Sequence, residues 1–429
     1  NFMASFIFIA NQVCRSGGNL LSRLFDGNKK IATYPSEVGF KLNKNLLKNN
    51  DKIIGAPTFL PKFDKNIDPV DFFELEKDYQ NYKYAENSYI HIGVRKNYLE
   101  KSYYEKKINT DFDFDKYFKN IRKYCNGASN NQELYYFKHK AFFHSWDNGI
   151  YWNDPNHIVT QDSNGLFLTN YDRFFSDFIG SIVFVPIRNC LGYVASEKIR
   201  IAKRYLGARR FAKPTPPNFI IKKFNEYDLK WLLNTWRVSL DKVKILQEKY
   251  RENVFVLPLE NLTENTQKVM DDIFLKLNTP VEEINYEPTI GGKTWLGNSH
   301  MGKIKGIKNN PNNYIHEILR QDEIDYINKK INNLDNILKS KNESFVDLTS
   351  IEDKYFFDVS KQRSLSKDND SWILYNSYYF RGYRKLKIKQ LDIFLILFSL
   401  FFQIYSKIYN FFKLKLLKIF PRDFNVNNT

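Results

Sequence analysis

The sequence SFIFIANQVCRSGGNLLSRLFDG, residues 5–27, decides how the fold begins. Its first part, Ser5–Ala10, is a short apolar run with aromatic and β-branched side chains, which predicts a buried strand. From Gly18 to Asp26, leucine and phenylalanine recur on one helical face, and Gly27 is suited to end a helix. The opening unit is therefore predicted to be a strand, a loop with two glycines, and a helix.

Similar units follow along the chain. Strands are predicted at 157–161, 182–187 and 254–259, and helices at 229–250 and 266–277. Strands that alternate with helices favour a parallel sheet that is covered on both faces. We therefore predict an α/β fold of three layers, with a central parallel sheet flanked by helices. Ligands of such folds bind at the carboxyl ends of the strands.

The composition indicates a basic protein with an anionic partner. The net charge is +17, and residues 381–422 hold ten Lys and Arg side chains against one acidic residue, Asp392. Within that segment, the apolar run 393–402 is too short to cross a bilayer. Two interpretations stay open: residues 385–420 lie on an anionic membrane surface, or the C-terminal segment packs on protein.

The cysteines and histidines predict neither disulfides nor a metal site. Cys14, Cys125 and Cys190 are far apart and odd in number, which fits a reducing compartment. The histidines lack metal-ligand spacing, so we predict that no metal is bound. The apolar run 6–10 is too short for a signal peptide, and a preceding N-terminal segment stays open because the sequence begins at Asn1.

The loop between the first strand and the first helix predicts an anion site. A loop in this position turns backbone N–H groups toward one point, where the helix N-terminus adds partial positive charge. Arg15 and Ser16 provide a cation and a hydroxyl, and Gly17 and Gly18 are expected to leave room for the anion. The GK[ST] ending of a Walker A loop is absent, which disfavours a nucleotide triphosphatase. An ordinary tight turn is the alternative.

RSGGNLLSRLFDG after a strand resembles the donor-binding loop of PAPS-dependent sulfotransferases, in particular their carbohydrate and bacterial branch with its P-loop NTPase-like fold. The resemblance implies that this loop holds the 5′-phosphosulfate of 3′-phosphoadenosine 5′-phosphosulfate (PAPS), with Arg15 at the bridging oxygen. Asn19 replaces the usual Ser or Thr and can still donate a hydrogen bond. The donor-loop residues implied are Arg15, Ser16, Gly17, Gly18, Asn19 and Leu20.

Two later segments resemble the 3′-phosphate site of the same family. Arg188 follows the strand IVFVPI, and Ser196 comes eight residues later, although Cys190 stands where proline is usual. A guanidinium can bind a phosphate with two hydrogen bonds, and the serine adds a third donor. The segment KTWLGNSHMGK, residues 293–303, resembles the late loop that closes over this phosphate. It implies roles for Gly297, Asn298, Ser299 and Lys303.

The proton acceptor implied by the resemblance is Glu37, which lies in a Glu-Val-Gly-Phe context near the start of the next element. The rival bases are His91, His139 and His144, none of which lies in a matching motif. Further side chains are given lesser roles. Glu260 is interpreted as structural, Trp236 is expected in the core rather than at the adenine, and Asn164 is a candidate for facing the acceptor.

Together these features predict transfer of a sulfuryl group from PAPS to an acceptor hydroxyl, with 3′,5′-adenosine bisphosphate as product and no metal. The acceptor is expected to be a carbohydrate or glycolipid. We expect no nucleic acid partner, and a cytoplasmic location with peripheral binding at the inner membrane face. The alternatives are another P-loop transferase, such as a kinase using ATP, and a non-enzymatic basic protein that binds membranes or polyanions. The oligomeric state cannot be read from the sequence.

The domain prediction follows from the extent of the resemblance. A sulfotransferase domain is predicted over residues 1–345, with 45–150 as an insertion on the acceptor side that carries some helices. Residues 346–429 are predicted to form a helical extension, which is membrane-associated in the first of the two interpretations above.

Overall fold

The computed structural model describes residues 4–13, 15–37, 63–73, 113–146, 152–161, 171–205, 229–295, 306–307, 309–331, 334–338 and 343–352. The chain divides into two compact units, and each is described by itself. The first unit comprises residues 1–193, 236–313 and 328–357, and the second comprises 194–235, 314–327 and 358–429.

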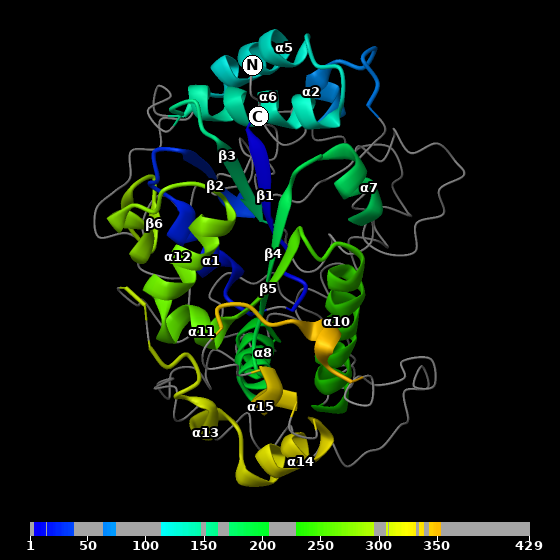
Figure 1. The fold of residues 1–429 in the computed structure, drawn as a ribbon, viewed down its shortest axis with the longest axis vertical. Helices are drawn as coiled ribbons and strands as arrows, with labels where there is room; N and C mark the ends of the chain where they lie inside the picture. Colours follow the sequence, from blue (N-terminus) through cyan, green and yellow to red (C-terminus); the bar gives the residue numbers. More distant parts are fainter. Residues whose placement is uncertain are drawn as a thin grey trace, which may run out of the picture. The chain divides into compact units, whose positions relative to one another are not determined.

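A parallel sheet of five strands forms the centre of the first unit, in the order β2-β3-β1-β4-β5 (Figure 1). The strands are β1 (Ser5–Ile9), β2 (Ile31–Glu37), β3 (His157–Gln161), β4 (Ile182–Ile187) and β5 (Val254–Pro258). The predicted α/β fold with a central parallel sheet is thereby confirmed. Strand β1 is the middle strand, so the loop that follows it leaves from the centre of the carboxyl edge.

One face of the sheet is covered by helices α1 (Gly18–Phe25), α11 (Leu259–Glu264) and α12 (Thr266–Lys276) (Figure 1). Alternate residues of each strand point to opposite faces. Ile7 and Ile9 therefore face this layer, where they join one apolar cluster with residues of all three helices. Burial of such side chains from water is the main force that fixes α1 on the sheet. The buried helix members of the cluster are Leu21, Leu24, Phe25, Leu262, Val269, Met270, Ile273 and Phe274.

The opposite face carries an aromatic layer. The ring of Phe6 lies 5.8 Å from that of His139 and 5.0 Å from that of Phe178, centroid to centroid. Tyr34 packs on Phe142 at 4.6 Å. The helices on this side are α6 (Asn131–Ser145), α7 (Tyr171–Asp177) and α10 (Leu229–Lys249) (Figure 1). Helix α6 thus packs directly on the sheet.

Shorter elements complete the described part of the chain. Helices α2 (Pro69–Phe72) and α5 (Phe114–Cys125) accompany α6, and β6 (Thr289–Ile290) pairs with β7 (Lys293–Thr294) in an antiparallel hairpin. The remaining elements are α8 (Cys190–Tyr205), η4 (Glu283–Tyr286), α13 (Ile315–Ile318), α14 (Gln321–Ile331), α15 (Leu334–Leu338) and η5 (Leu348–Ser350). Among the helices that are described, none is both long enough and apolar enough to cross a membrane.

The predicted strands and helices are confirmed, and each ends at the predicted residue or just before it. Strand β2 was missed, because its sequence IATYPSE contains proline and polar residues. Glu37 therefore ends a strand rather than starting the next element, which corrects our prediction. Val346 pairs with Val256 of β5 in an antiparallel bridge. The predicted membrane-surface segment 385–420 lies outside the described residues.

Candidate functional site

The loop between β1 and α1 contains two left-handed residues. Arg15 has a φ of 66° and Gly17 a φ of 91°, and the N–H of Leu21 donates to the Gly17 carbonyl at 2.9 Å to begin α1. A left-handed residue next to right-handed ones turns successive N–H groups inward, toward one point. The two left-handed residues are compatible with the predicted anion-binding turn, which stays a prediction.

The two glycines of the loop each have a side chain packed closely against them. A Cβ atom on Gly17 would lie 2.5 Å from Cδ1 of Leu259, and one on Gly18 would lie 1.6 Å from Oδ1 of Asn11. Gly17 is also held at a positive φ that other residues rarely adopt. The glycines therefore let α11 and the Asn11 carboxamide approach the loop, and the expectation that they leave room for an anion stays a prediction.

The start of α1 lacks two features that often stabilise a helix N-terminus. Gly17 at the N-cap provides no side-chain hydrogen bond, and the first turn has no acidic residue. Ser16 is only 2% exposed, and its Oγ makes no hydrogen bond to any residue in the described ranges. Buried hydroxyls and helix N–H groups are normally paired, because leaving them unpaired costs about 1–3 kcal/mol. The unpaired Oγ of Ser16 therefore suits a bound oxyanion at the start of α1.

Strand β3 brings a side chain to this loop that sequence reasoning missed. Gln161, the last residue of β3, donates from Nε2 to Oδ1 of Asn19 at 2.6 Å. It lies beside Ile9 in the parallel register. The bond occupies the Asn19 oxygen and leaves its Nδ2 as the donor, as the predicted role requires. The sequence did contain a signal for this residue, because the apolar strand ends in two polar residues, Thr160 and Gln161.

Arg188 directly follows β4 and is nearly buried, at 5% exposure. Its Nε and Nη2 donate to Oδ1 of Asn312 at 3.2 and 2.8 Å, and Nη2 also donates to the Pro311 carbonyl at 2.7 Å. Its Nη1 faces the carbonyl of Arg15 at 3.4 Å. The structure thus brings Arg188 to the donor loop. The two-nitrogen edge that we expected to bind a phosphate is instead occupied by Asn312.

The start of α8 explains why cysteine replaces proline after Arg188. The N–H of Cys190 donates to Oδ1 of Asp335 at 2.7 Å, and proline has no N–H to make this bond. Burial raises the pKa of the Cys190 thiol well above its usual value, so this side chain is not a reactive thiolate. Ser196 lies farther along α8, in the second unit, and is 8% exposed. Its role toward a phosphate stays a prediction.

Glu260 and Trp236 support Arg188 from two sides. Glu260 is buried, and its Oε1 accepts from Nδ2 of Asn312 at 2.7 Å and from the N–H of Asn189 at 3.3 Å. Trp236 is fully buried, and its Nε1 donates to the carbonyl of Arg188 at 2.9 Å. The expected core position of Trp236 is confirmed, and Glu260 has the structural contacts expected of it.

The carboxyl end of β2 is held close to α1 by Arg23, which the sequence analysis did not single out. The Nη2 of this buried side chain donates to the carbonyl of Pro35, and the guanidinium lies 5.9 Å from the ring of Trp295. The backbone of Glu37 follows two residues after Pro35. Through this contact, β2 ends beside the helix that begins at the donor loop.

The hairpin β6–β7 is anchored to the other end of α1. Asp26 accepts hydrogen bonds at Oδ2 from Oγ1 of Thr289 at 2.8 Å and from the N–H of Gly292 at 2.9 Å. Burial raises the pKa of the Asp26 carboxyl above its usual value, although these hydrogen bonds oppose the shift. The predicted late loop, residues 293–303, therefore begins on the α1 side, where its first residues, up to Trp295, are described.

Several predicted site residues lie outside the described residues. The structure gives no side-chain position for Glu37, although its backbone ends β2. The same holds for the late loop and for two lesser candidates, so their roles stay predictions. These positions are Gly297, Asn298, Ser299, Lys303, His91 and Asn164.

Of the three rival bases, the two that are described, His139 and His144, belong to α6 rather than to the donor loop. His144 bonds through Nδ1 to the Tyr124 hydroxyl at 2.8 Å. His139 is buried against Phe6 and Tyr34, on the face of the sheet opposite α1, and its Nδ1 lies 2.6 Å from the carbonyl of Tyr135. Burial lowers the pKa of His139 to about 3, which makes it a poor base.

His139 is expected to make the protein sensitive to acid. Its pKa is about 3 when folded and 6.5 when exposed, so below pH 6.5 only the unfolded chain takes up the proton. The free energy of unfolding should therefore fall as the pH falls from 6.5 toward 3, by about 2 kcal/mol between pH 7 and pH 5. Urea unfolding of the wild type and of His139→Gln at both pH values measures this. Equal pH dependence in the two proteins would contradict the assignment.

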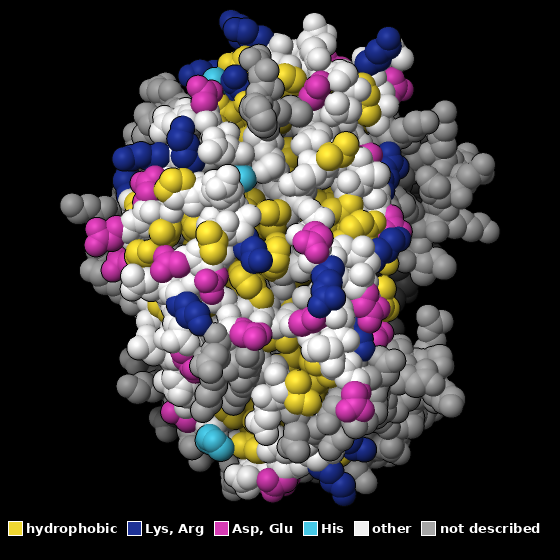
Figure 2. Space-filling model, in the orientation of Figure 1, with side chains coloured by type: hydrophobic (Ala, Val, Ile, Leu, Met, Phe, Trp, Pro, Cys, Tyr) yellow, Lys and Arg dark blue, Asp and Glu magenta, His cyan; other side chains and the backbone are white. Residues whose placement is uncertain are grey.

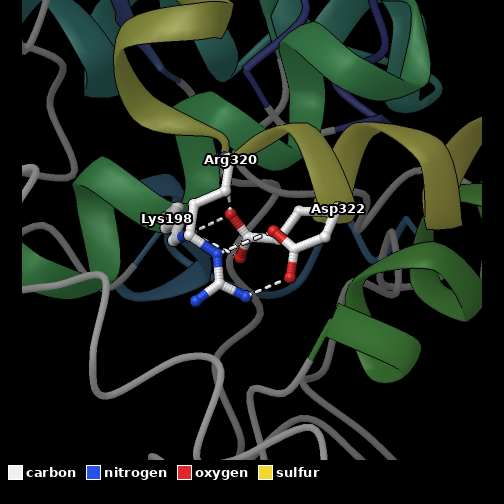
Figure 3. Close-up of polar contacts among 4 residues, drawn as sticks. Lys198, Arg320 and Asp322 are labelled. Carbon is white, nitrogen blue, oxygen red and sulfur yellow. Dashed lines mark hydrogen bonds and ion pairs between the residues drawn. The ribbon is translucent and has the colours of Figure 1, made fainter.

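In the second unit, a buried ion pair joins α8 to α14 (Figure 3). Lys198 donates from Nζ to both carboxylate oxygens of Glu323, at 2.6 and 2.8 Å, and both side chains are almost fully buried. The N–H of Arg320 also donates to Oε2 of Glu323 at 3.0 Å, and the Arg320 side chain pairs with Asp322. Burial lowers the pKa of Lys198 to about 8, against the opposing effect of Glu323.

One face of the described part of the chain shows no large patch of positive charge (Figure 2). On the face drawn in Figure 2, Lys and Arg side chains are interspersed with Asp and Glu among the coloured residues. The most basic stretch, residues 381–422, is not among them. Within the described ranges, no three His, Cys, Asp or Glu side chains are grouped so that they could hold a metal ion.

Comparison with known proteins gives structural neighbours only. No known family matches the chain by sequence, and no curated protein matches it. The sulfotransferase domain from the curacin biosynthetic pathway is similar over 77% of this chain and 99% of that domain, at 14% identity and a TM-score of 0.38. The sulfotransferase domain from the Synechococcus PCC 7002 olefin synthase is similar over 76% and 93%, at 12% identity and 0.37.

A third neighbour is sulfotransferase STF9 from Mycobacterium avium, with 66% of each chain covered, 12% identity and a TM-score of 0.30. The structural neighbours are sulfotransferases. At these identities and scores, the similarities assign neither a site residue nor a substrate to this chain.

Proposed function

We propose that this protein is a sulfotransferase that transfers the sulfuryl group of PAPS to a hydroxyl of a carbohydrate or glycolipid. One observation carries the proposal. At the carboxyl end of the central strand, α1 begins without a side-chain cap beside the buried, unpaired Oγ of Ser16, in a loop with left-handed turns at Arg15 and Gly17. Such a loop suits a phosphate or sulfate group, and its sequence resembles the PAPS-binding loop.

In this proposal the chain's own groups act mainly by position and charge. Transfer forms a bond between the acceptor oxygen and sulfur, and it breaks the bond between sulfur and the 5′-phosphate oxygen, which keeps the electron pair. Arg15 and the amides from Ser16 to Leu20 stabilise the charge on that leaving phosphate. The carboxylate of Glu37 takes the proton of the acceptor hydroxyl. A fixed cation and backbone dipoles provide the stabilisation, so the proposed mechanism includes no metal.

The remaining predicted residues are proposed to select the nucleotide. Arg188 and Ser196 bind the 3′-phosphate, and Gly297, Asn298, Ser299 and Lys303 close over it. The contact between Nη1 of Arg188 and the carbonyl of Arg15 supports this assignment, because it brings a buried cation to the donor loop. A phosphate there would receive a charge-assisted hydrogen bond in a poorly hydrated setting.

The acceptor side of the proposal rests on sequence alone. Residues 45–150 are proposed to bind the acceptor, and 385–420 to bind an anionic membrane surface, which would suit a lipid-linked sugar. A cytoplasmic location at the inner membrane face belongs to the same proposal, as does the absence of a nucleic acid partner.

Calorimetric titration tests the donor site. The protein is titrated with 3′,5′-adenosine bisphosphate, with 5′-AMP, and with ATP plus Mg²⁺. We expect the bisphosphate to bind about 10- to 100-fold more tightly than 5′-AMP without metal, since each charge-assisted hydrogen bond to the 3′-phosphate contributes about 1.5–3 kcal/mol. A preference for ATP with Mg²⁺ would instead indicate a kinase. Failure to bind any nucleotide would favour a non-enzymatic polyanion-binding protein.

A further inference from the structure

A short chain of hydrogen bonds runs from Glu260 through Asn312 to Arg188. Asn312 accepts with one atom, Oδ1, from both Nε and Nη2 of Arg188, at 3.2 and 2.8 Å. Its other terminal atom, Nδ2, donates to Oε1 of Glu260 at 2.7 Å. The two ends of one carboxamide therefore contact a cation and an anion, each through the atom of the suitable polarity.

Glu260 determines which way the Asn312 carboxamide faces. Its Oε1 atom accepts hydrogen bonds from Asn312 and from the N–H of Asn189. A carboxylate oxygen can only accept, so the Asn312 side chain must face Glu260 with its NH₂ group. If the amide were flipped, its oxygen would face the carboxylate and its NH₂ group would face the guanidinium. Both contacts would then be repulsive. Water could not replace the two lost hydrogen bonds, because Glu260 and Arg188 are buried, at 6% and 5% exposure.

The orientation of Arg188 follows from that of Asn312. With Nε and Nη2 held by Asn312, and Nη2 also donating to the Pro311 carbonyl at 2.7 Å, the third nitrogen is turned toward the donor loop. There Nη1 approaches the carbonyl of Arg15 at 3.4 Å. The backbone of Arg188 is fixed as well, because Trp236 donates to its carbonyl at 2.9 Å.

Gly192, in the first turn of α8, lies against the side chains of Asn312 and Arg188 and leaves room for them. A Cβ atom at this position would lie 2.2 Å from Oδ1 of Asn312, 2.6 Å from Nε of Arg188 and 2.7 Å from Oδ1 of Asn189. All three distances are shorter than any real Cβ contact. The polar groups of three separate side chains thus converge over one glycine, and any side chain at this position would displace the Asn312 carboxamide from Arg188.

We propose that Asn312, oriented by Glu260, is a positioning residue that turns Arg188 toward the donor loop and so sets the preference for a nucleotide with a 3′-phosphate. The inference rests on the proposed function, because it takes Arg188 as the partner of that phosphate. A neutral carboxamide suits the role. Aspartate would neutralise the guanidinium, and an apolar residue would leave its buried donors unpaired.

The test compares the affinities for 3′,5′-adenosine bisphosphate and 5′-AMP, which differ only in the 3′-phosphate. In Asn312→Ala, we expect the affinity for the bisphosphate to fall about tenfold while that for 5′-AMP stays within about twofold. Asn312→Asp combined with Glu260→Gln keeps the shape, and the glutamine NH₂ group can donate to the new carboxylate, so this double variant tests the proposal even if the alanine variant does not fold. It should also lower the bisphosphate affinity, because a carboxylate competes with the phosphate for Arg188. Asn313→Ala, at the exposed neighbouring position, is the matched control.

The ratio of the two affinities separates a positioning role from a structural one. A residue needed only for stability would lower both affinities together or only the melting temperature. A wild-type ratio in both Asn312 variants would overturn the inference and leave the proposed function standing. If the wild type itself does not distinguish the bisphosphate from 5′-AMP, the proposed function fails and this inference fails with it.

Discussion

Replacing Arg15 with alanine is expected to slow sulfuryl transfer by about 100- to 1,000-fold, because the side chain is proposed to stabilise charge that develops on the leaving phosphate. Loss of a group that acts mainly in the transition state lowers kcat and kcat/KM together. The fold should tolerate the change, since the half-buried Arg15 side chain is not part of the apolar core. The free energy of unfolding is therefore expected to change by about 1 kcal/mol or less.

The measurement is the rate of release of 3′,5′-adenosine bisphosphate from PAPS, with water as acceptor until a faster acceptor is found. Arg15→Lys keeps the charge and should retain part of the rate. Arg251→Ala is the matched control, because this arginine lies on the surface, 69% exposed, in an ion pair with Asp347. Equal rates in Arg15→Ala and in the wild type would remove Arg15 from the proposed mechanism.

The opening unit could be predicted because its determinants are local. The apolar run of β1, the glycines of the loop and the leucine spacing of α1 each act over a few residues. Parallel pairing could also be predicted, because alternating strands and helices leave few other arrangements. Arg188 follows from the same logic: it comes directly after β4, which pairs with β1, so it must reach the same edge as the donor loop.

The partners of these residues could not be predicted, because they come from distant parts of the chain. Asn312 lies in an Asn-rich stretch whose pattern gives no hint of a contact with Arg188. The contact between the Asn11 side chain and Gly18 could not be predicted from the loop motif, which does not specify a residue at position 11. Strand β2 has an unfavourable local sequence and is held by tertiary contacts, among them pairing with β3 and the Arg23 hydrogen bond to Pro35. Contacts of this kind depend on the completed fold.

Cys190 shows how a departure from a family motif can be understood only in the structure. The family motif that this sequence resembles has proline at this position. In this chain the backbone N–H at position 190 is needed for Asp335, so proline would leave a buried carboxylate oxygen without its donor. The substitution therefore follows from a contact that this chain makes, and it does not weaken the assignment of Arg188.

The largest loss of stability is expected from breaking the buried ion pair between Lys198 and Glu323. Both side chains are almost fully removed from water, at 3% and 2% exposure. Replacing Lys198 with methionine leaves the Glu323 carboxylate without its cation in a poorly hydrated site. We expect the free energy of unfolding to fall by about 3–5 kcal/mol, measured by urea denaturation. The matched control is Lys249→Met, since Lys249 pairs with Asp172 on the surface, and there we expect no measurable change.

A double variant shows whether the loss comes from the uncompensated charge or from packing. In Lys198→Met combined with Glu323→Gln, no charge remains buried at this position, and the glutamine oxygen can still accept from the N–H of Arg320, now 3.0 Å from Oε2. Most of the lost stability should therefore return, because desolvation of an unpaired ion is the main cost in the single variant. If the double variant is as unstable as Lys198→Met alone, the contribution of Lys198 comes from the packing of its aliphatic stem between α8 and α14, and the electrostatic explanation is wrong.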